Sequence, residues 1–102
     1  MPLMLLQIDF KTDRPPSKKN TDDLTQLAQV IANTPGLIWK IWTENPTTQE
    51  AGGIYLFEDE ASLDTYLEIH TNRLSQMGIS NINAKKFQVN TRLSEITKAI
   101  LP

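Results

Sequence analysis

Apolar side chains occupy both faces of two successive β-rich segments, and this pattern restricts the possible folds more than any other feature of the chain. In an extended backbone, successive side chains point to opposite faces. Residues 37–44 then carry apolar groups on each face, with Leu37, Trp39 and Ile41 opposite Ile38 and Trp42. Residues 51–57 repeat the arrangement, with Ile54 and Leu56 opposite Tyr55 and Phe57. A sheet with one solvated face would alternate polar and apolar residues, so we expect both faces to be covered.

The remaining segments supply the other parts of an α+β domain. Apolar and β-preferring residues predict strands at 3–10, 37–44, 51–57 and 82–89. Helical spacing and capping residues predict one helix from Asn20 or Thr21, a second after Asp59 and a short last one over 93–100. Pro15 and Pro16 place a loop over 11–20. The order β-α-β-β-α-β is that of the split βαβ, or ferredoxin-like, sandwich, formed here as a single domain over residues 1–102.

Both helices of such a fold lie on one face of the sheet. The opposite face would then expose a larger apolar patch than monomers normally tolerate. A second copy of the same sheet, packed face to face about a two-fold axis, is the simplest cover. We therefore predict a homodimer, with a partly filled chamber between the two sheets walled by residues of the helix-free face.

Composition excludes several classes of function. Ten Lys and Arg against twelve Asp and Glu lack the basic excess of a nucleic-acid-binding protein. The absence of cysteine removes disulfides, thiolate metal sites and a cysteine nucleophile. Pro2, Gln7 and Asp9 interrupt the apolar start, which matches neither a signal peptide nor a membrane span. We expect a cytoplasmic protein without nucleic-acid or membrane partners.

Three stretches of sequence resemble the YdhR-like putative mono-oxygenases, a family of the dimeric α+β barrel superfamily. The stretches are Trp39-Lys40-Ile41-Trp42-Thr43-Glu44, Glu50-Ala51-Gly52-Gly53-Ile54-Tyr55-Leu56-Phe57, and Tyr66-Leu67-Glu68 with His70-Thr71 and Arg73-Leu74. The resemblance implies a two-fold dimer with a pocket between sheet and helices. It also implies oxygenation of a small aromatic or polycyclic substrate by dioxygen, with no metal, flavin or other cofactor.

An oxygenase without a cofactor needs a base, an apolar cavity and a hydrogen-bond donor for the developing oxyanion. His70 is the only histidine and shares a helical stripe with Leu63 and Tyr66, which makes it the candidate base. The alternative is a core imidazole bonded to a nearby carbonyl. Tyr55 and Tyr66 are the candidate hydroxyl donors, or else they pack with their hydroxyls at the surface.

The candidate substrate-binding residues are Trp39, Trp42, Lys40, Glu44 and Phe57. Trp39 and Trp42 are three apart on a strand, so only one of them can line a given cavity. A buried Lys40 would need a carboxylate, and Glu44 or Glu50 would provide it in a salt bridge at the rim of the barrel.

Other functions fit the same sequence. The cavity could belong to a dimeric module that binds a small apolar molecule without catalysis, or to a haem-degrading relative that uses His70. An RNA-recognition domain shares the element order and would use Tyr55 and Phe57, but the acidic balance and Glu50-Ala51 do not fit its signature. The chain has no glycine-rich nucleotide motif, and one histidine cannot form a two-histidine iron site.

Overall fold

The computed structural model describes residues 2–13 and 21–102. In these residues a four-stranded antiparallel sheet has the order β2-β3-β1-β4. The strands are β1 (Met4–Lys11), β2 (Leu37–Asn45), β3 (Glu50–Phe57) and β4 (Asn83–Gln88), and the helices are α1 (Thr21–Ala32), α2 (Glu60–Gln76) and α3 (Thr91–Ile96). The ferredoxin-like α+β prediction is confirmed. The loop expected over 11–20 and the Asn20 cap fall largely on residues 14–20, outside the described residues.

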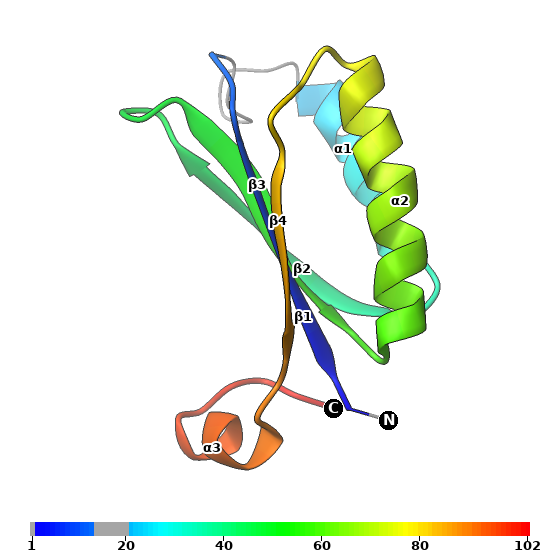
Figure 1. Cartoon of the computed structure of the whole chain (residues 1–102), viewed down its shortest axis with the longest axis vertical. Coiled ribbons are helices and arrows are strands. Elements are labelled where there is room, and N and C mark those ends of the chain that lie inside the picture. Colours follow the sequence, from blue (N-terminus) through cyan, green and yellow to red (C-terminus); the bar gives the residue numbers. More distant parts are fainter. Residues whose placement is uncertain (1, 14–20) are drawn as a thin grey trace.

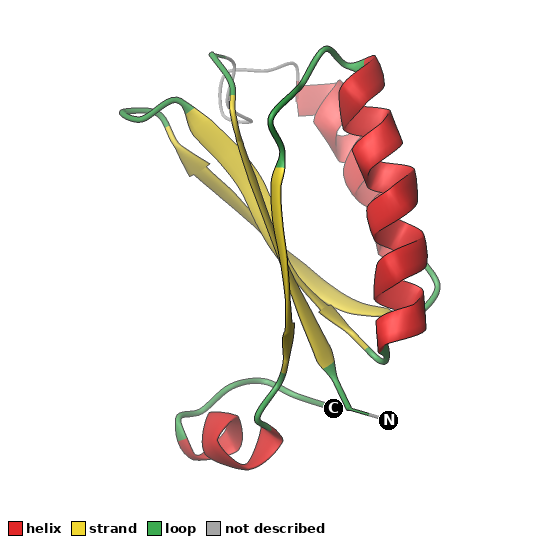
Figure 2. Cartoon of the chain, viewed as in Figure 1, coloured by secondary structure: helices red, strands yellow, loops and turns green. Residues whose placement is uncertain are grey.

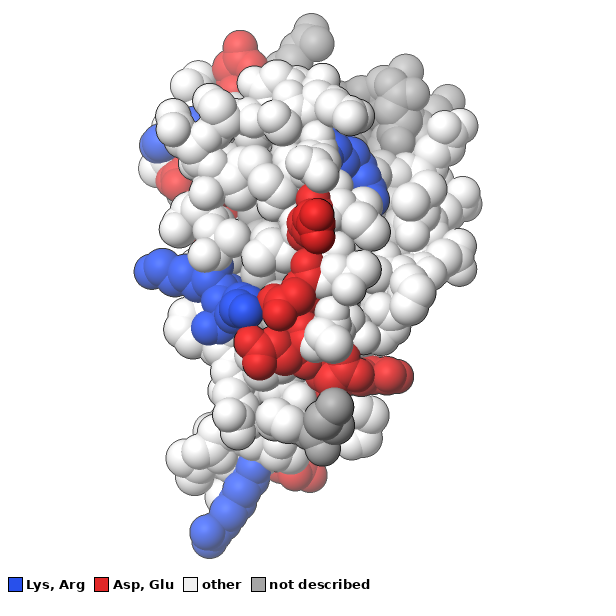
Figure 3. Space-filling model, turned by 45° about the vertical axis from the view of Figure 1, so that its right-hand side comes forward, with Lys and Arg blue, Asp and Glu red and all other residues white. Residues whose placement is uncertain are grey.

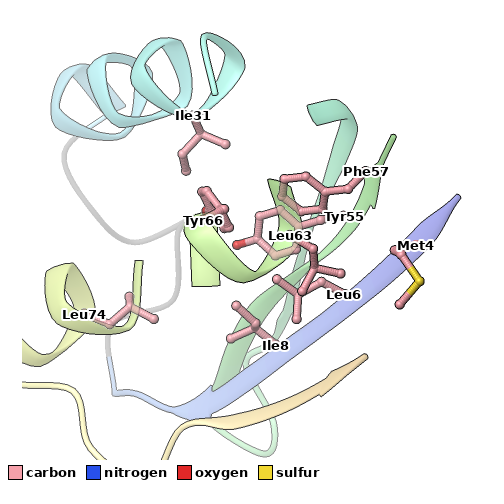
Figure 4. Packing of buried hydrophobic residues seen from close by; sticks show 9 residues of the cluster. All are labelled: Met4, Leu6, Ile8, Ile31, Tyr55, Phe57, Leu63, Tyr66 and Leu74. Carbon is pink, nitrogen blue, oxygen red and sulfur yellow. The ribbon is translucent and has the colours of Figure 1, made fainter. Parts of the chain in front are cut away.

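Helices α1 and α2 pack side by side on one face of the sheet, whereas α3 lies beyond one end of it (Figures 1 and 2). The core fills the space between these two helices and the sheet (Figure 4). Alternate residues of β1 and β3 point into it, as the two-residue period of a strand requires. Its members are Met4, Leu6, Ile8, Ile31, Tyr55, Phe57, Leu63, Tyr66 and Leu74.

The helix α2 begins and ends where the sequence predicts. Asp59 is its N-cap, and its Oδ1 accepts a hydrogen bond of 2.7 Å from the Ser62 N–H. Gly78 follows the helix with φ +84, a left-handed conformation that suits glycine. At the β4 edge of the sheet, Lys86 bridges Glu60 and Asp64 of α2 at 3.0 and 2.9 Å. On the face shown in Figure 3, acidic side chains form a column and basic side chains gather beside it.

A β-bulge at the start of β2 corrects one sequence prediction. Leu37 pairs with Phe57, but Trp39 pairs with the next residue, Leu56, so Ile38 is one extra residue in β2. The extra residue switches the face on which the following side chains lie. Leu37 therefore packs against the core, and the prediction that it shares a face with Trp39 and Ile41 is wrong.

The helix-free face is apolar in the half nearest α3, whereas in the other half Gln7 pairs with Lys85 and Asp9 with Asn83. Cross-strand pairs place Trp39 beside Leu56, Ile41 beside Ile54, and Leu5 beside both Leu56 and Phe87. Ile41 is 55% exposed and Phe87 47% exposed. The indole Nε1 of Trp39 donates a 3.1 Å hydrogen bond to the Ile100 carbonyl, which ties the segment after α3 to this face. Within the described residues, no helix is long and apolar enough to cross a membrane.

Candidate active site

A narrow cavity lies between the sheet and the helices, on the face that carries the core. Its volume is about 480 Å³, which includes space that is open to solvent. Only a small part of this volume is wide enough for a water molecule. Its lining residues are Phe10, Thr12, Leu24, Leu27, Lys40, Trp42, Ala51, Gly52, Tyr55, His70, Leu74, Met77 and Ile79. The family resemblance implies a pocket at this place. The chamber expected between two sheets would lie on the opposite face.

The structure brings together most of the residues that the sequence singles out. Lys40 and Trp42 reach the cavity from β2, Tyr55 from β3 and His70 from α2. Tyr66 lies one helical turn before His70, and its ring stacks on the imidazole with centroids 5.1 Å apart and planes at 19°. These five side chains form the group that we call the cavity cluster.

The other three candidate residues do not line the cavity. Trp39 is on the opposite face of the sheet, since Lys40 and Trp42 face the helices and side chains alternate along β2. Phe57 is fully buried in the core, where its ring packs 5.5 Å from that of Tyr66. Glu44 is exposed near the end of β2.

His70 is buried without a partner on one of its ring nitrogens. The residue is 3% exposed, and its Nδ1 has no hydrogen-bond partner. Burial lowers the pKa of the imidazole to about 3, with further contributions from the charges of Lys40 and Arg73. The side chain is therefore neutral at neutral pH, and its Nδ1 is free to bond to a ligand.

Lys40 has no carboxylate partner among the described residues, which corrects the predicted salt bridge. Four residues along a strand separate Lys40 from Glu44, about 13 Å between backbones, and this spacing keeps the carboxylate at the exposed end of β2. The ammonium instead lies over two aromatic rings, with Nζ 3.5 Å from the Trp42 centroid and 4.8 Å from that of Tyr55. Burial, and then the charge of Arg73, lowers the pKa of Lys40 to about 7.

Two tyrosine hydroxyls complete the cluster. Burial raises the pKa of Tyr55 to about 12 and raises the pKa of Tyr66 further, so both hydroxyls keep their protons at neutral pH. The Tyr55 hydroxyl is near enough to affect the titration of Tyr66. Nevertheless, the buried Tyr66 hydroxyl makes no hydrogen bond of good geometry. It is available as a donor.

Arg73 is the charged residue that the sequence reasoning missed. It lies one turn after His70 on α2, and its Nη1 is buried without a partner. Its charge influences the pKa values of Lys40, Tyr55, Tyr66 and His70, although Arg73 itself does not line the cavity. The sequence signal that could have identified Arg73 is its spacing of three residues from His70, which puts both residues on one face of α2. Within the described residues, no three His, Asp or Glu side chains gather into a site that could hold a metal ion.

Fold and cavity together define the class of protein: a ferredoxin-like α+β domain with an aromatic cavity between its sheet and helices. Residues 5–100 match the family described as "Putative mono-oxygenase ydhR". The chain therefore belongs to this family. A search of curated protein sequences finds no match.

Two crystal structures share the fold. A protein of unknown function from Nitrosomonas europaea, NE2512, has a TM-score of 0.68 at 16% identity, over 100% of this chain and 96% of that one. SnoaB from Streptomyces nogalater, described as a cofactor-independent oxygenase and solved as a point mutant, has a TM-score of 0.63 at 13% identity. That match covers 88% of this chain and 95% of SnoaB. At such identities the likeness concerns the fold alone.

Proposed function

We propose that this protein is a mono-oxygenase that works without a bound cofactor on a small hydroxyaromatic substrate held in the cavity. The observation that carries the proposal is the cavity cluster itself. A lysine amine with a pKa of about 7 and an unpartnered imidazole lie within one narrow aromatic cavity. Family membership and the fold of SnoaB support the same kind of reaction.

The substrate must supply the electrons in such a reaction. A base removes the proton of a hydroxyl group, which leaves an electron-rich aromatic anion. This anion gives one electron to dioxygen, and the substrate radical and superoxide combine in a new carbon–oxygen bond. Cleavage of the oxygen–oxygen bond then gives a carbonyl group and water, so that a ring CH₂ and O₂ become C=O and H₂O. The apolar walls keep bulk water from the anion.

We assign the proton-accepting role to Lys40 and a hydrogen-bonding role to His70. A general base works best with a pKa near the working pH, and Lys40 meets this condition. With a pKa of about 3, His70 is a weak base but a good hydrogen-bonding partner for the substrate hydroxyl. Tyr66 donates to the developing oxyanion, Tyr55 forms the floor of the cavity, and Trp42 gives a flat wall for the aromatic ring.

We also propose that the active form is a homodimer joined through the helix-free face. Ile41 and Phe87 expose apolar surface there, and the segment that follows α3 adds Ile100, which is 83% exposed. Trp39 then contributes to the dimer and Phe57 to the core rather than to substrate binding, and Glu44 stays exposed near the end of β2. A second copy would cover the exposed apolar side chains and leave the cavity of each subunit on its helix side.

Oxygen uptake tests the proposed reaction. Purified protein, stripped of metals with a chelator, is mixed with anthrone-type and hydroquinone-type compounds in an oxygen electrode. We expect consumption above the autoxidation rate, and a loss of at least about tenfold in Lys40→Met. Lys86→Met, which removes a lysine on the helix side of β4 that lies outside the cavity, is the matched control and should keep full activity. Binding of these compounds without any oxygen uptake would identify a non-catalytic binding module instead.

A further inference from the structure

Several buried hydrogen-bonding groups around the cavity have no partner. The Tyr66 hydroxyl, His70 Nδ1 and Arg73 Nη1 are buried side-chain atoms that make no hydrogen bond in the described structure. Leaving a buried donor or acceptor unpaired costs on the order of 1 to 3 kcal/mol. Three such groups on consecutive turns of α2 form a cluster that a ligand would satisfy.

Two positive charges near the cavity also lack partners among the described residues. Lys40 and Arg73 are near enough for the arginine charge to lower the lysine pKa, and neither makes an ion pair within the described residues. The lining residues include no Asp or Glu. Buried cations are normally paired, and the described residues provide no counter-charge for these two.

We propose that the cavity binds its aromatic substrate as the oxyanion, with the ring against Trp42 and the charged oxygen held by Lys40 and His70, which line the cavity, under the influence of the nearby Arg73 charge. This inference rests on the proposed function, which it deepens by naming the ionisation state of the substrate. An oxyanion accepts hydrogen bonds from both side chains, and bonds to a charged acceptor are about twice as strong as neutral ones.

The packing around Lys40 allows its ammonium group to contact such a ligand. Its ammonium lies over the Trp42 and Tyr55 rings, an attraction that an arriving anion exceeds. Gly53, opposite Trp42 on β3, leaves space for the lysine chain, because a Cβ at this position would lie 2.7 Å from Lys40 Cε. The part of the cavity that is wide enough for water can hold the phenolate oxygen. The ring would lie at the open side, where Trp42 is 36% exposed.

The groups near the anion come from three elements. Lys40 comes from β2, Tyr55 from β3, and Tyr66, His70 and Arg73 from α2. Arg73 keeps its charge at any working pH, whereas Lys40 loses its charge above a pKa of about 7. Binding of an oxyanion should therefore weaken as the pH rises through this pKa, without vanishing.

4-Nitrophenol is a suitable probe, since its phenolate absorbs visible light and its pKa lies near neutrality. We expect the bound probe to ionise about one pH unit lower than the free probe, which means that the phenolate binds about tenfold more tightly than the phenol. 4-Nitroanisole has the same ring but cannot ionise, and it should bind more weakly at neutral pH. Quenching of tryptophan fluorescence gives its affinity.

Variants identify the groups responsible. Lys40→Met and Arg73→Met should each abolish most of the shift, Arg73→Lys should keep part of it, and Lys86→Met, outside the cavity, should leave it unchanged. Circular dichroism checks that each variant folds. A bound probe that ionises at the same or a higher pH than the free one, or an equal affinity for 4-nitroanisole, overturns the inference. The measurement needs no dioxygen: a shift without oxygen uptake contradicts the oxygenase alone, whereas uptake without a shift contradicts the oxyanion site alone.

Discussion

Lys40 occupies a position that favours its neutral form. Its side chain crosses from β2 into an apolar cavity near Arg73, and these surroundings lower its pKa from 10.5 to about 7. The unfolded chain has no such constraint, so it binds the lysine proton more strongly than the folded protein does between these two pH values. A residue that destabilises the fold in this way is typical of a functional site.

Replacing Lys40 by methionine should stabilise the protein. Below pH 7 the ammonium is charged in both states and folding must bury it, so the full cost is present there. The cost decreases as pH rises from about 7 to 10.5, where the unfolded state also loses the proton. We expect Lys40→Met to raise the free energy of unfolding by about 1 to 3 kcal/mol at about pH 6, and the gain to disappear near pH 10.5. Urea denaturation at both pH values checks this, and an equal gain at both would contradict it.

His70 should make the protein sensitive to acid. Its pKa falls from 6.5 in the unfolded chain to about 3 in the fold, so the unfolded state binds more protons between these values. Stability from this group is fully present above pH 6.5 and decreases towards pH 3, by about 1.4 kcal/mol per pH unit. His70→Phe keeps a ring against Tyr66 and removes the titration. Its free energy of unfolding should fall less steeply than that of the wild type between about pH 6 and pH 4, and parallel curves would show that His70 does not titrate as described.

Among the elements, β3 shows how two adjacent glycines serve different purposes. The sequence predicts a bulge or a close approach at Gly52-Gly53. The structure shows a close approach, because a Cβ on Gly52 would collide with the backbone carbonyl of Ile8 on β1. A Cβ on Gly53 would instead meet the flexible end of Lys40 and, at 3.1 Å, the Tyr55 ring. Gly52 thus permits strand pairing and Gly53 shapes the cavity.

Alanine at each glycine separates these two effects. Gly52→Ala should lower the free energy of unfolding by more than about 2 kcal/mol, because β1 and β3 must move apart. Gly53→Ala should cost less in stability but displace Lys40, and so reduce binding of the 4-nitrophenolate probe. Thermal unfolding and probe titration of both variants test the pair. Equal losses of stability would contradict the distinction.

Local signals predict the elements well but the cavity only in part. Asp59 and Gly78 bound α2 because capping depends on a few neighbouring residues. The bulge at Ile38 was not predictable, since an extra residue shows only in pairing with another strand. Arg73 was missed for a related reason. A cluster formed by β2 and α2, which are separated in the sequence by the whole of β3, depends on packing that no local pattern records.

At the scale of the whole molecule, the two faces of the sheet differ in what covers them. The helix side holds the core and the cavity, and the helix-free side exposes apolar groups along β2 and β4. Face-to-face packing of two sheets would need about 800 Å² from each partner, as a stable dimer of standard size requires. The apolar pairs on this face lie in its α3 half, where the exposed segment after α3 adds to the apolar surface.

The proposed dimer can be tested with two variants, one that introduces a negative charge on the helix-free side and one that introduces it on the helix side. Ile41→Asp places a carboxylate on the helix-free face of the edge strand β2, where it would be buried without a partner in the dimer but solvated in the monomer. Val30→Asp makes the same kind of change on α1, on the helix side, at a residue of similar exposure. Sedimentation equilibrium at micromolar concentration should give a dimer for the wild type and Val30→Asp, and a monomer for Ile41→Asp. A monomeric wild type, or a dimer that Ile41→Asp leaves intact, would place the subunit contact elsewhere or remove it.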